Sequence, residues 1–200
     1  MILHAFYNSK NIGDVLLVRL CDERNIDSYL RQDDVCVLKK GNKIIGYNIF
    51  NASLYFNDLN DGKVRITENF VEEMNDLLDR YNYDHVISDF NDHFVVAKVI
   101  EMTEHPDSDH MHICKVDDGT EVHTIVCGAP NVQEGQLVVM AQIGAVMPSG
   151  LIIKPSSLRG IESNGMLCSA RELALENAPM KRGILVLDED KYSIGQSFFG

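Results

Sequence analysis

Three residues suited to nucleic-acid contact lie close together in residues 161–169, late in the chain. Ser163 has a hydroxyl group that can donate and accept a hydrogen bond, and Met166 offers a polarisable surface to a base or a sugar. Gly165 lacks a Cβ atom, so its backbone can come close to a ligand. Three basic residues flank the segment, namely Lys154, Arg159 and Arg171. Together these residues predict an RNA-facing strand and loop.

A second group lies in residues 105–114, whose sequence is HPDSDHMHIC. His110, His112 and Cys114 are spaced at i, i+2 and i+4, so they would share one face of a strand and could hold a metal ion. A fourth ligand would come from Asp107, Asp109 or His105. Because an alternating strand aligns any such trio by default, we expect no metal or other cofactor. We expect His110 to contact phosphate instead, more strongly once its imidazole is protonated.

Residues 127–132, CGAPNV, predict a fixed turn at the end of a strand, because they contain both Gly and Pro. The amide of Asn131 could contact a nucleotide or pin the loop. The role in keeping the fold is the simpler of the two.

The charge of the chain opposes binding to a polyanion. The 200 residues carry a formal net charge of -12, and residues 1–92 and 93–200 are each acidic. Residues 151–171, in contrast, hold three basic residues and one acid, Glu162. A local positive patch is therefore predicted within an acidic protein.

Composition and motifs exclude several classes of protein. Hydrophobic residues make up 45% of the chain and charged residues 24%, which is typical of a globular protein. The five cysteines are widely spaced without a CxxC pair, so we expect reduced and mostly buried thiols. No nucleotide-binding loop or hydrolase elbow is present, and we predict no enzyme. Neither a charged leader with a long apolar run nor an 18-residue apolar stretch occurs, so we expect a cytoplasmic protein without membrane contact.

The order of the elements predicts two domains, residues 1–90 and 91–200, with a polar boundary at residues 88–92. In the first, β-branched runs at residues 15–20 and 35–38 and a hairpin ending in residues 44–50 precede a helix over 70–81. Asn69 and Glu72 form a possible capping pair for this helix. The first domain is therefore expected to be small and α+β.

The second domain is predicted to be a small barrel of short strands. The expected strands cover residues 94–102, 111–116, 122–127, 137–143, 151–153 and 184–187. Ser169 and Glu172 form a capping box, which predicts a short helix that ends before Pro179. The expected fold class is mainly β (α+β).

Three blocks carry a family resemblance: residues 105–119, residues 125–132 and the Ser-x-Gly-Met motif at residues 163–166. They resemble the tRNA-binding OB-fold module of the bacterial phenylalanyl-tRNA synthetase β subunit and of EMAP II-type proteins. The arrangement looks most like YtpR-type proteins, in which a short N-terminal domain precedes the module. The resemblance implies a five-stranded OB-fold barrel and tRNA contact through the motif. Two positions depart from the pattern: Asn164 replaces a frequent acid, and His110 replaces a frequent Lys or Arg.

We therefore expect a non-catalytic protein that binds tRNA, and not DNA, by shape and backbone. The expected RNA-binding residues are Lys154, Arg159, Ser163, Gly165, Met166, Asn131, His110 and Arg171. A second hypothesis is a protein-interaction module that docks a synthetase, a ribosome-associated partner or a second copy of the chain. This hypothesis is based on the net charge of -12, which opposes binding to a polyanion.

Overall fold

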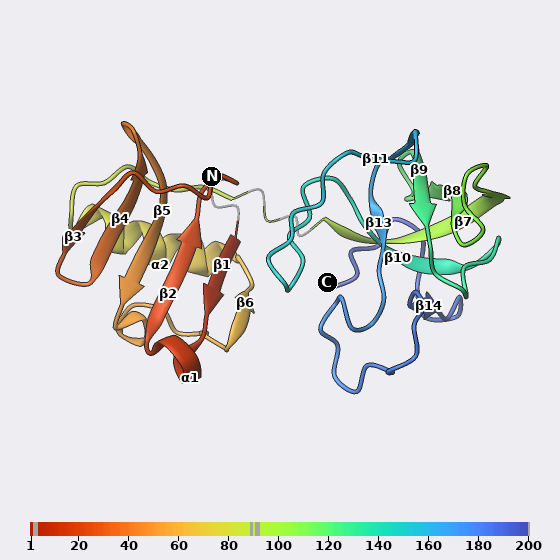
Figure 1. Ribbon diagram of the computed structural model, residues 1–200. Helices are drawn as coiled ribbons and strands as arrows, with labels where there is room; N and C mark the ends of the chain where they lie inside the picture. The colour runs from red at the N-terminus through yellow and green to blue at the C-terminus, as the bar shows by residue number, and fades with distance from the viewer. Residues whose placement is uncertain (2–3, 89, 91–92, 200) are drawn as a thin grey trace. The chain divides into compact units, whose positions relative to one another are not determined.

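The computed structural model describes residues 1, 4–88, 90 and 93–199, and the chain forms two compact units, Met1–Asn91 and Asp92–Gly200 (Figure 1). Of the polar boundary predicted at residues 88–92, Asp89, Asn91 and Asp92 lie outside the described residues.

Unit 1 is built on a six-stranded antiparallel sheet with the order β3-β4-β5-β2-β1-β6. Its strands are β1 (His4–Tyr7), β2 (Val15–Arg19), β3 (Ser28–Gln32), β4 (Val35–Lys40), β5 (Lys43–Phe50) and β6 (Gly62–Val64). Two short helical segments, α1 (Ser9–Ile12) and η1 (Ala52–Leu54), lie in the connections. The predicted hairpin is confirmed as β4–β5, in which Lys40 pairs with Lys43 around the turn. Strands β1, β3 and β6 are short, and the sequence did not predict them.

Helix α2 (Glu68–Asp79) covers one face of this sheet. Its apolar residues recur at helical spacing, and the side chains of Phe70, Met74 and Leu77 join the core formed by Leu16 and Tyr47 of the sheet.

The start of α2 differs from the prediction. Thr67 is the N-cap residue, and its side chain accepts a hydrogen bond from the backbone N–H of Phe70 at 3.2 Å. The predicted pair of Asn69 and Glu72 is wrong, because the chain already has helical geometry at Glu68.

Unit 2 contains a strongly bent antiparallel sheet with the order β13-β10-β7-β8-β9, and β14 also pairs with β10. Its strands are β7 (Phe94–Glu104), β8 (His112–Asp117), β9 (Val122–Cys127), β10 (Leu137–Ala141), β13 (Met166–Leu167) and β14 (Val186–Leu187). A separate hairpin joins β11 (Ser156–Leu158) to β12 (Ile161–Ser163). The five strands on the main path give unit 2 its OB-like fold.

Two predicted elements of unit 2 take another form. Residues 151–153 make only an isolated bridge, between Ile152 and Val146, instead of a strand. The capping box forms, since the backbone N–H of Ser169 donates to Glu172 and that of Glu172 to the Ser169 hydroxyl, but no helix follows. The chain leaves helical geometry after one turn, because Ala174 has a φ of 53°.

The cysteines follow the sequence-based prediction. All five are free thiols, four of them are buried, and Cys21 is half-buried. No helix within the described part of the chain is long and apolar enough to cross a membrane.

Candidate nucleic-acid interface

The β11–β12 hairpin presents a basic side chain at its tip. Leu158 pairs with Ile161, so Arg159 and Gly160 form a two-residue turn, in which both have positive φ (47° and 85°). The tight turn makes the side chain of Arg159 project from the hairpin, and Arg159 is exposed.

The loop that precedes β8 anchors this turn. His105 is only 3% exposed, and its Nε2 atom lies 3.1 Å from the carbonyl oxygen of Leu158. Its Nδ1 atom accepts a hydrogen bond from the backbone N–H of Asp107 at 3.1 Å, and these two contacts together require the tautomer protonated at Nε2. The guanidinium of Arg159 donates to the carbonyl oxygen of Asp107. The HPDSD motif is thus a clamp for the hairpin, and it brings the segment of exposed His110 close to Arg159.

The cavity beside this loop does not itself favour phosphate. It has a volume of about 620 Å³, and its lining includes the acidic residues Glu104 and Asp109. A polyanion would therefore contact the exposed tip of the hairpin more favourably than the cavity.

Ser163 and Asn164 close the barrel. The Oγ atom of Ser163 accepts a hydrogen bond from the backbone N–H of Val126 at 3.1 Å, and the backbone N–H of Asn164 donates to Thr124 at 2.9 Å. Both partners belong to β9, which is one end of the main strand path. Ser163 is 2% exposed. The hydroxyl is therefore buried and already bonded, which favours a structural role, and direct RNA contact through it stays a prediction.

Gly165 and Met166 continue this closure toward the other end of the path. Gly165 has a φ of 141°, and a Cβ atom at this position would lie 2.8 Å from the Cε atom of Met140. Met166 pairs with Ala141 on β10 and packs, half-buried, against a core cluster. The close approach at Gly165 is thus to the protein interior, and the position of Met166 favours a packing role.

Asn131 pins its loop. Its Oδ1 atom accepts from the backbone N–H of Ile184 at 2.8 Å, and its Nδ2 atom donates to the carbonyl oxygen of Ile184 at 3.0 Å. This pair of hydrogen bonds uses both ends of the amide, which supports the fold-keeping alternative.

Two basic residues that the sequence analysis missed lie close to Asn131 in the structure. Lys181 and Arg182 are exposed and directly precede Gly183, against which the Asn131 side chain packs. The signal was the adjacency of two basic residues in an acidic chain, and the hydrogen bonds between Asn131 and Ile184 help to attach this segment to the barrel.

The predicted cations stay exposed, and they lie on different segments of unit 2. Lys154, Arg159 and Arg171 are all exposed. Within the described residues, neither arginine forms an ion pair with a carboxylate, whereas Lys98 pairs with Glu189 at 3.1 Å. Arg171 lies in the turn after Cys168, whose backbone N–H donates to Val139, and not on the β11–β12 hairpin.

The residues of the metal alternative do not converge. Cys114 is buried in the barrel core among Val116 and Ile125, whereas His110 is exposed in the turn before β8. The described part of the chain contains no group of three His, Cys, Asp or Glu side chains placed to hold an ion.

A buried carboxylate stabilises the β8–β9 turn. The Oδ1 atom of Asp118 accepts hydrogen bonds from the Thr120 hydroxyl and the backbone N–H groups of Thr120 and Glu121, and Oδ2 lies 2.7 Å from both His123 and Gln142. Burial alone would raise the pKa of Asp118, but these hydrogen bonds outweigh burial, and the pKa lies well below its usual value.

Both units of the chain match families of known proteins. Residues 94–195 match the family described as "Putative tRNA binding domain", and residues 22–88 match a domain of unknown function. The "Putative tRNA-binding protein YtpR" of Bacillus subtilis is 44% identical over 200 residues, which cover 98% of this chain and 99% of the relative.

Two partial relatives match about half of the chain. The phenylalanine–tRNA ligase beta subunit of Sulfurimonas denitrificans is 53% identical over 104 residues, which are 51% of this chain and 13% of that subunit. The solved C-terminal domain of Plasmodium vivax p43 has a TM-score of 0.38 and 21% identity, and covers 51% of this chain and 56% of that chain. That TM-score is too low to support a structural argument. The full-length match and the family match over residues 94–195 show that this chain belongs to the YtpR-type family of tRNA-binding-domain proteins.

Proposed function

We propose that this protein binds tRNA without catalysing a reaction, through exposed basic residues of unit 2 that include Arg159 at the tip of the β11–β12 hairpin. OB-folds hold oligonucleotides on their outer strands and loops, and contacts to the phosphate backbone need cations that are not already neutralised. The observation that carries the proposal is the position of Arg159. Its guanidinium stands at the hairpin tip, is oriented by the carbonyl oxygen of Asp107, and has no carboxylate partner within the described residues.

The proposed contacts are the four exposed basic positions of the sequence analysis, together with the newly found pair. These residues are Lys154, Arg159, Arg171, His110, Lys181 and Arg182. Ser163, Gly165 and Asn131 support the surface from beneath, because their polar groups or their close packing are used inside the barrel.

Titration of the full-length protein with unfractionated tRNA tests this proposal. We expect Lys154→Ala and Arg159→Ala each to weaken binding by about three- to tenfold. The matched control for Arg159→Ala is Lys191→Ala, because Lys191 is exposed like Arg159 but pairs with Asp188 at 3.2 Å. Unchanged affinity in both test variants, with melting curves like that of the parent protein, would contradict the proposal.

Docking of a protein partner is the second candidate. It is favoured by helix α2, whose five acids (Glu68, Glu72, Glu73, Asp76 and Asp79) have no basic residue among them. Such a surface suits a basic protein, including a synthetase. The two functions separate by mutation: Glu72→Gln with Asp76→Asn should weaken a protein complex and leave tRNA affinity unchanged or slightly raised.

A further inference from the structure

The second face of the sheet in unit 1 has no helix of the described residues over it. Side chains alternate between the two faces of a strand, so Leu16 and Val18 face α2 while Leu17 and Arg19 face the opposite way. In Figure 1, α2 passes behind the strands, and no helix lies in front of them. A small cluster of Cys36, Leu38 and Ile45 is buried near Cys21, whereas much of the remaining face is only half-buried.

One row of side chains crosses this open face from edge to edge. The strand registers place six residues directly opposite one another, in the order Arg31, Cys36, Asn48, Leu17, Phe6 and Lys63. With neighbouring strands about 4.8 Å apart, the row spans about 24 Å. A basic residue therefore stands at each end of an apolar and amide-bearing strip.

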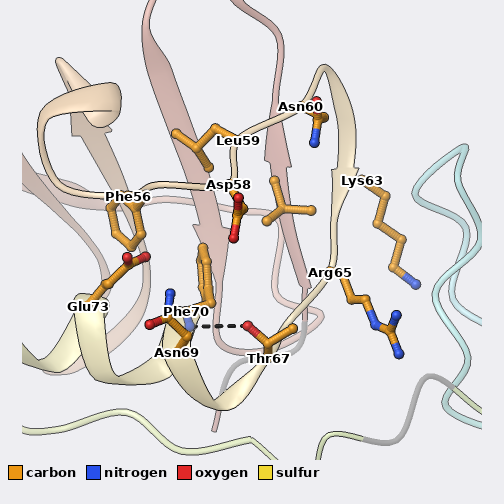
Figure 2. Close-up of a pocket in the computed structure, with 11 residues that line it drawn as sticks. Phe56, Asp58, Leu59, Asn60, Lys63, Arg65, Thr67, Asn69, Phe70 and Glu73 are labelled. Carbon is orange, nitrogen blue, oxygen red and sulfur yellow. Dashed lines mark hydrogen bonds between the residues drawn. The ribbon is translucent and has the colours of Figure 1, made fainter. Parts of the chain in front are cut away.

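Further cations lie beside this row. Arg19 is directly opposite His4 in the adjacent row. Lys63 and Arg65 extend to the same side of their segment in Figure 2, and both line a pocket together with Phe70 and Leu59. Burial, followed by the charges of Arg19 and Lys63, lowers the pKa of His4 to about 4, and Asp22 opposes this effect. The positive charges of Arg19 and Lys63 thus add to the effect of burial at His4, on the strand next to the edge of the sheet.

Some of the charges of unit 1 are divided between the two sides of its sheet. The five acids of α2 lie on the helix side, whereas Arg19, Arg31 and Lys63 belong to the open face. The net charge of the chain therefore does not describe the field over this face, because nearby charges dominate at distances within a Debye length of about 8–10 Å.

Aromatic side chains lie beside the basic residues of the open face. The guanidinium of Arg31 lies 3.7 Å from the centre of the Phe50 ring, and Tyr29, which is 73% exposed, precedes Arg31 by two residues on the same face. Phe6 is half-buried and lies next to Lys63, near one end of the row. Aromatic rings and stacked guanidinium planes are the groups on which unpaired bases stack, while arginines between them hold phosphates.

We propose that the open face of the unit 1 sheet binds an unpaired stretch of RNA, with bases on Tyr29 and Phe6 and phosphates on Arg19 and Arg31. This inference adds a second surface to the proposed function and rests on it in one respect, the choice of RNA as the polyanion.

The test uses the full chain and a fluorescent 12-nucleotide oligouridylate, with an RNA duplex of equal length beside it. We expect Arg19→Glu with Arg31→Glu to weaken oligouridylate binding by about tenfold or more. The slope of log affinity against log salt should fall by about 0.7 for each phosphate that the variant no longer neutralises. Tyr29→Ala should weaken binding about fivefold or more. The duplex should be affected less, because its bases are already stacked.

Arg80→Glu is the matched control. Arg80 also lies over an aromatic ring, at 5.7 Å from the centre of Tyr55, but it belongs to the C-terminal end of α2. We expect its substitution to change affinity by less than about twofold. An equal loss in Arg80→Glu and in the open-face variant would show a general field effect and overturn the assignment.

The proposals for the two surfaces can be refuted independently. If Lys154→Ala with Arg159→Ala abolishes RNA binding while the open-face variants bind normally, the inference is wrong and the proposed function stands. If only the open-face variants lose binding, the inference stands and the hairpin site is wrong. Light scattering on the same samples tests whether a second copy of the chain binds this face instead. A dimer that dissociates on open-face substitution, with unchanged RNA affinity, would show a self-association surface. That result would refute RNA binding there.

Discussion

The Oγ atom of Ser163 accepts a hydrogen bond from the backbone N–H of Val126 at 3.1 Å, and this bond attaches β12 to the edge strand β9. The residue most suggestive of ligand contact in the sequence is thus used to close the barrel. Under the proposed function, exposed cations such as Arg159 make the RNA contacts instead.

Ser163→Ala should lower the free energy of unfolding by about 1–3 kcal/mol, because it leaves the buried N–H of Val126 without an acceptor. Urea denaturation measures this, with Ser157→Ala on the exposed strand β11 as the control. The tRNA affinity of the folded variant should stay within about twofold of the parent. A large loss of affinity without a loss of stability would restore Ser163 as a contact residue.

Gly165→Ala should destabilise the protein by more than Gly150→Ala. Both glycines have positive φ, but a Cβ atom on Gly165 would meet Met140 at 2.8 Å and Ala141 at 3.1 Å, whereas one on Gly150 meets nothing within 4 Å. We expect a difference of about 1–3 kcal/mol between the two variants in denaturant unfolding. Equal costs would mean that backbone conformation alone requires glycine at position 165.

Asp118→Asn should cost about 2–3 kcal/mol at pH 7, because the buried carboxylate accepts several hydrogen bonds that an amide cannot all replace. The pKa of Asp118 is lower in the folded than in the unfolded protein, so its stabilising effect is present above the unfolded value of about 3.9 and is lost as pH falls below it.

Unfolding curves at pH 7 and pH 3 check this sign. The difference between parent and Asp118→Asn should shrink at the lower pH. Exposed Asp190→Asn serves as the control. A difference that grows on acidification would contradict the assignment.

His105→Ala should loosen the β11–β12 hairpin, because it removes the contact between His105 and the carbonyl oxygen of Leu158. Hydrogen exchange of residues 156–163 should speed up by about fivefold or more. His110→Ala, in the same loop but exposed, should leave these amides unchanged. Equal protection in both variants would show that the hairpin does not depend on the clamp.

Thr67→Ala should cost about 1 kcal/mol of stability, since Thr67 caps α2 by accepting from Phe70. Asn69→Ala should cost much less in the same thermal or urea unfolding experiment. A larger loss of stability in Asn69→Ala than in Thr67→Ala would mean that Asn69 caps the helix, as the sequence pattern predicted.

Local patterns in the sequence determined the elements that depend on near neighbours. The period of the apolar residues predicted α2, the Lys40–Lys43 turn predicted the β4–β5 hairpin, and the three motif blocks predicted the OB-like barrel of unit 2. The capping box at Ser169 also formed, but a positive φ at Ala174 ended the turn before a helix could begin.

Tertiary structure alone decided which side chains remain available to a ligand. The Ser163 hydroxyl bonds to the backbone of Val126, which is 37 residues away in the chain, and is therefore not exposed to solvent. Residue spacing within the local motif cannot predict such a non-local contact. The same is true of Arg31, Phe6 and Lys63, which share one row only because the sheet order β3-β4-β5-β2-β1-β6 brings them into register. Non-local strand pairing sets both outcomes, because it fixes which face each side chain occupies.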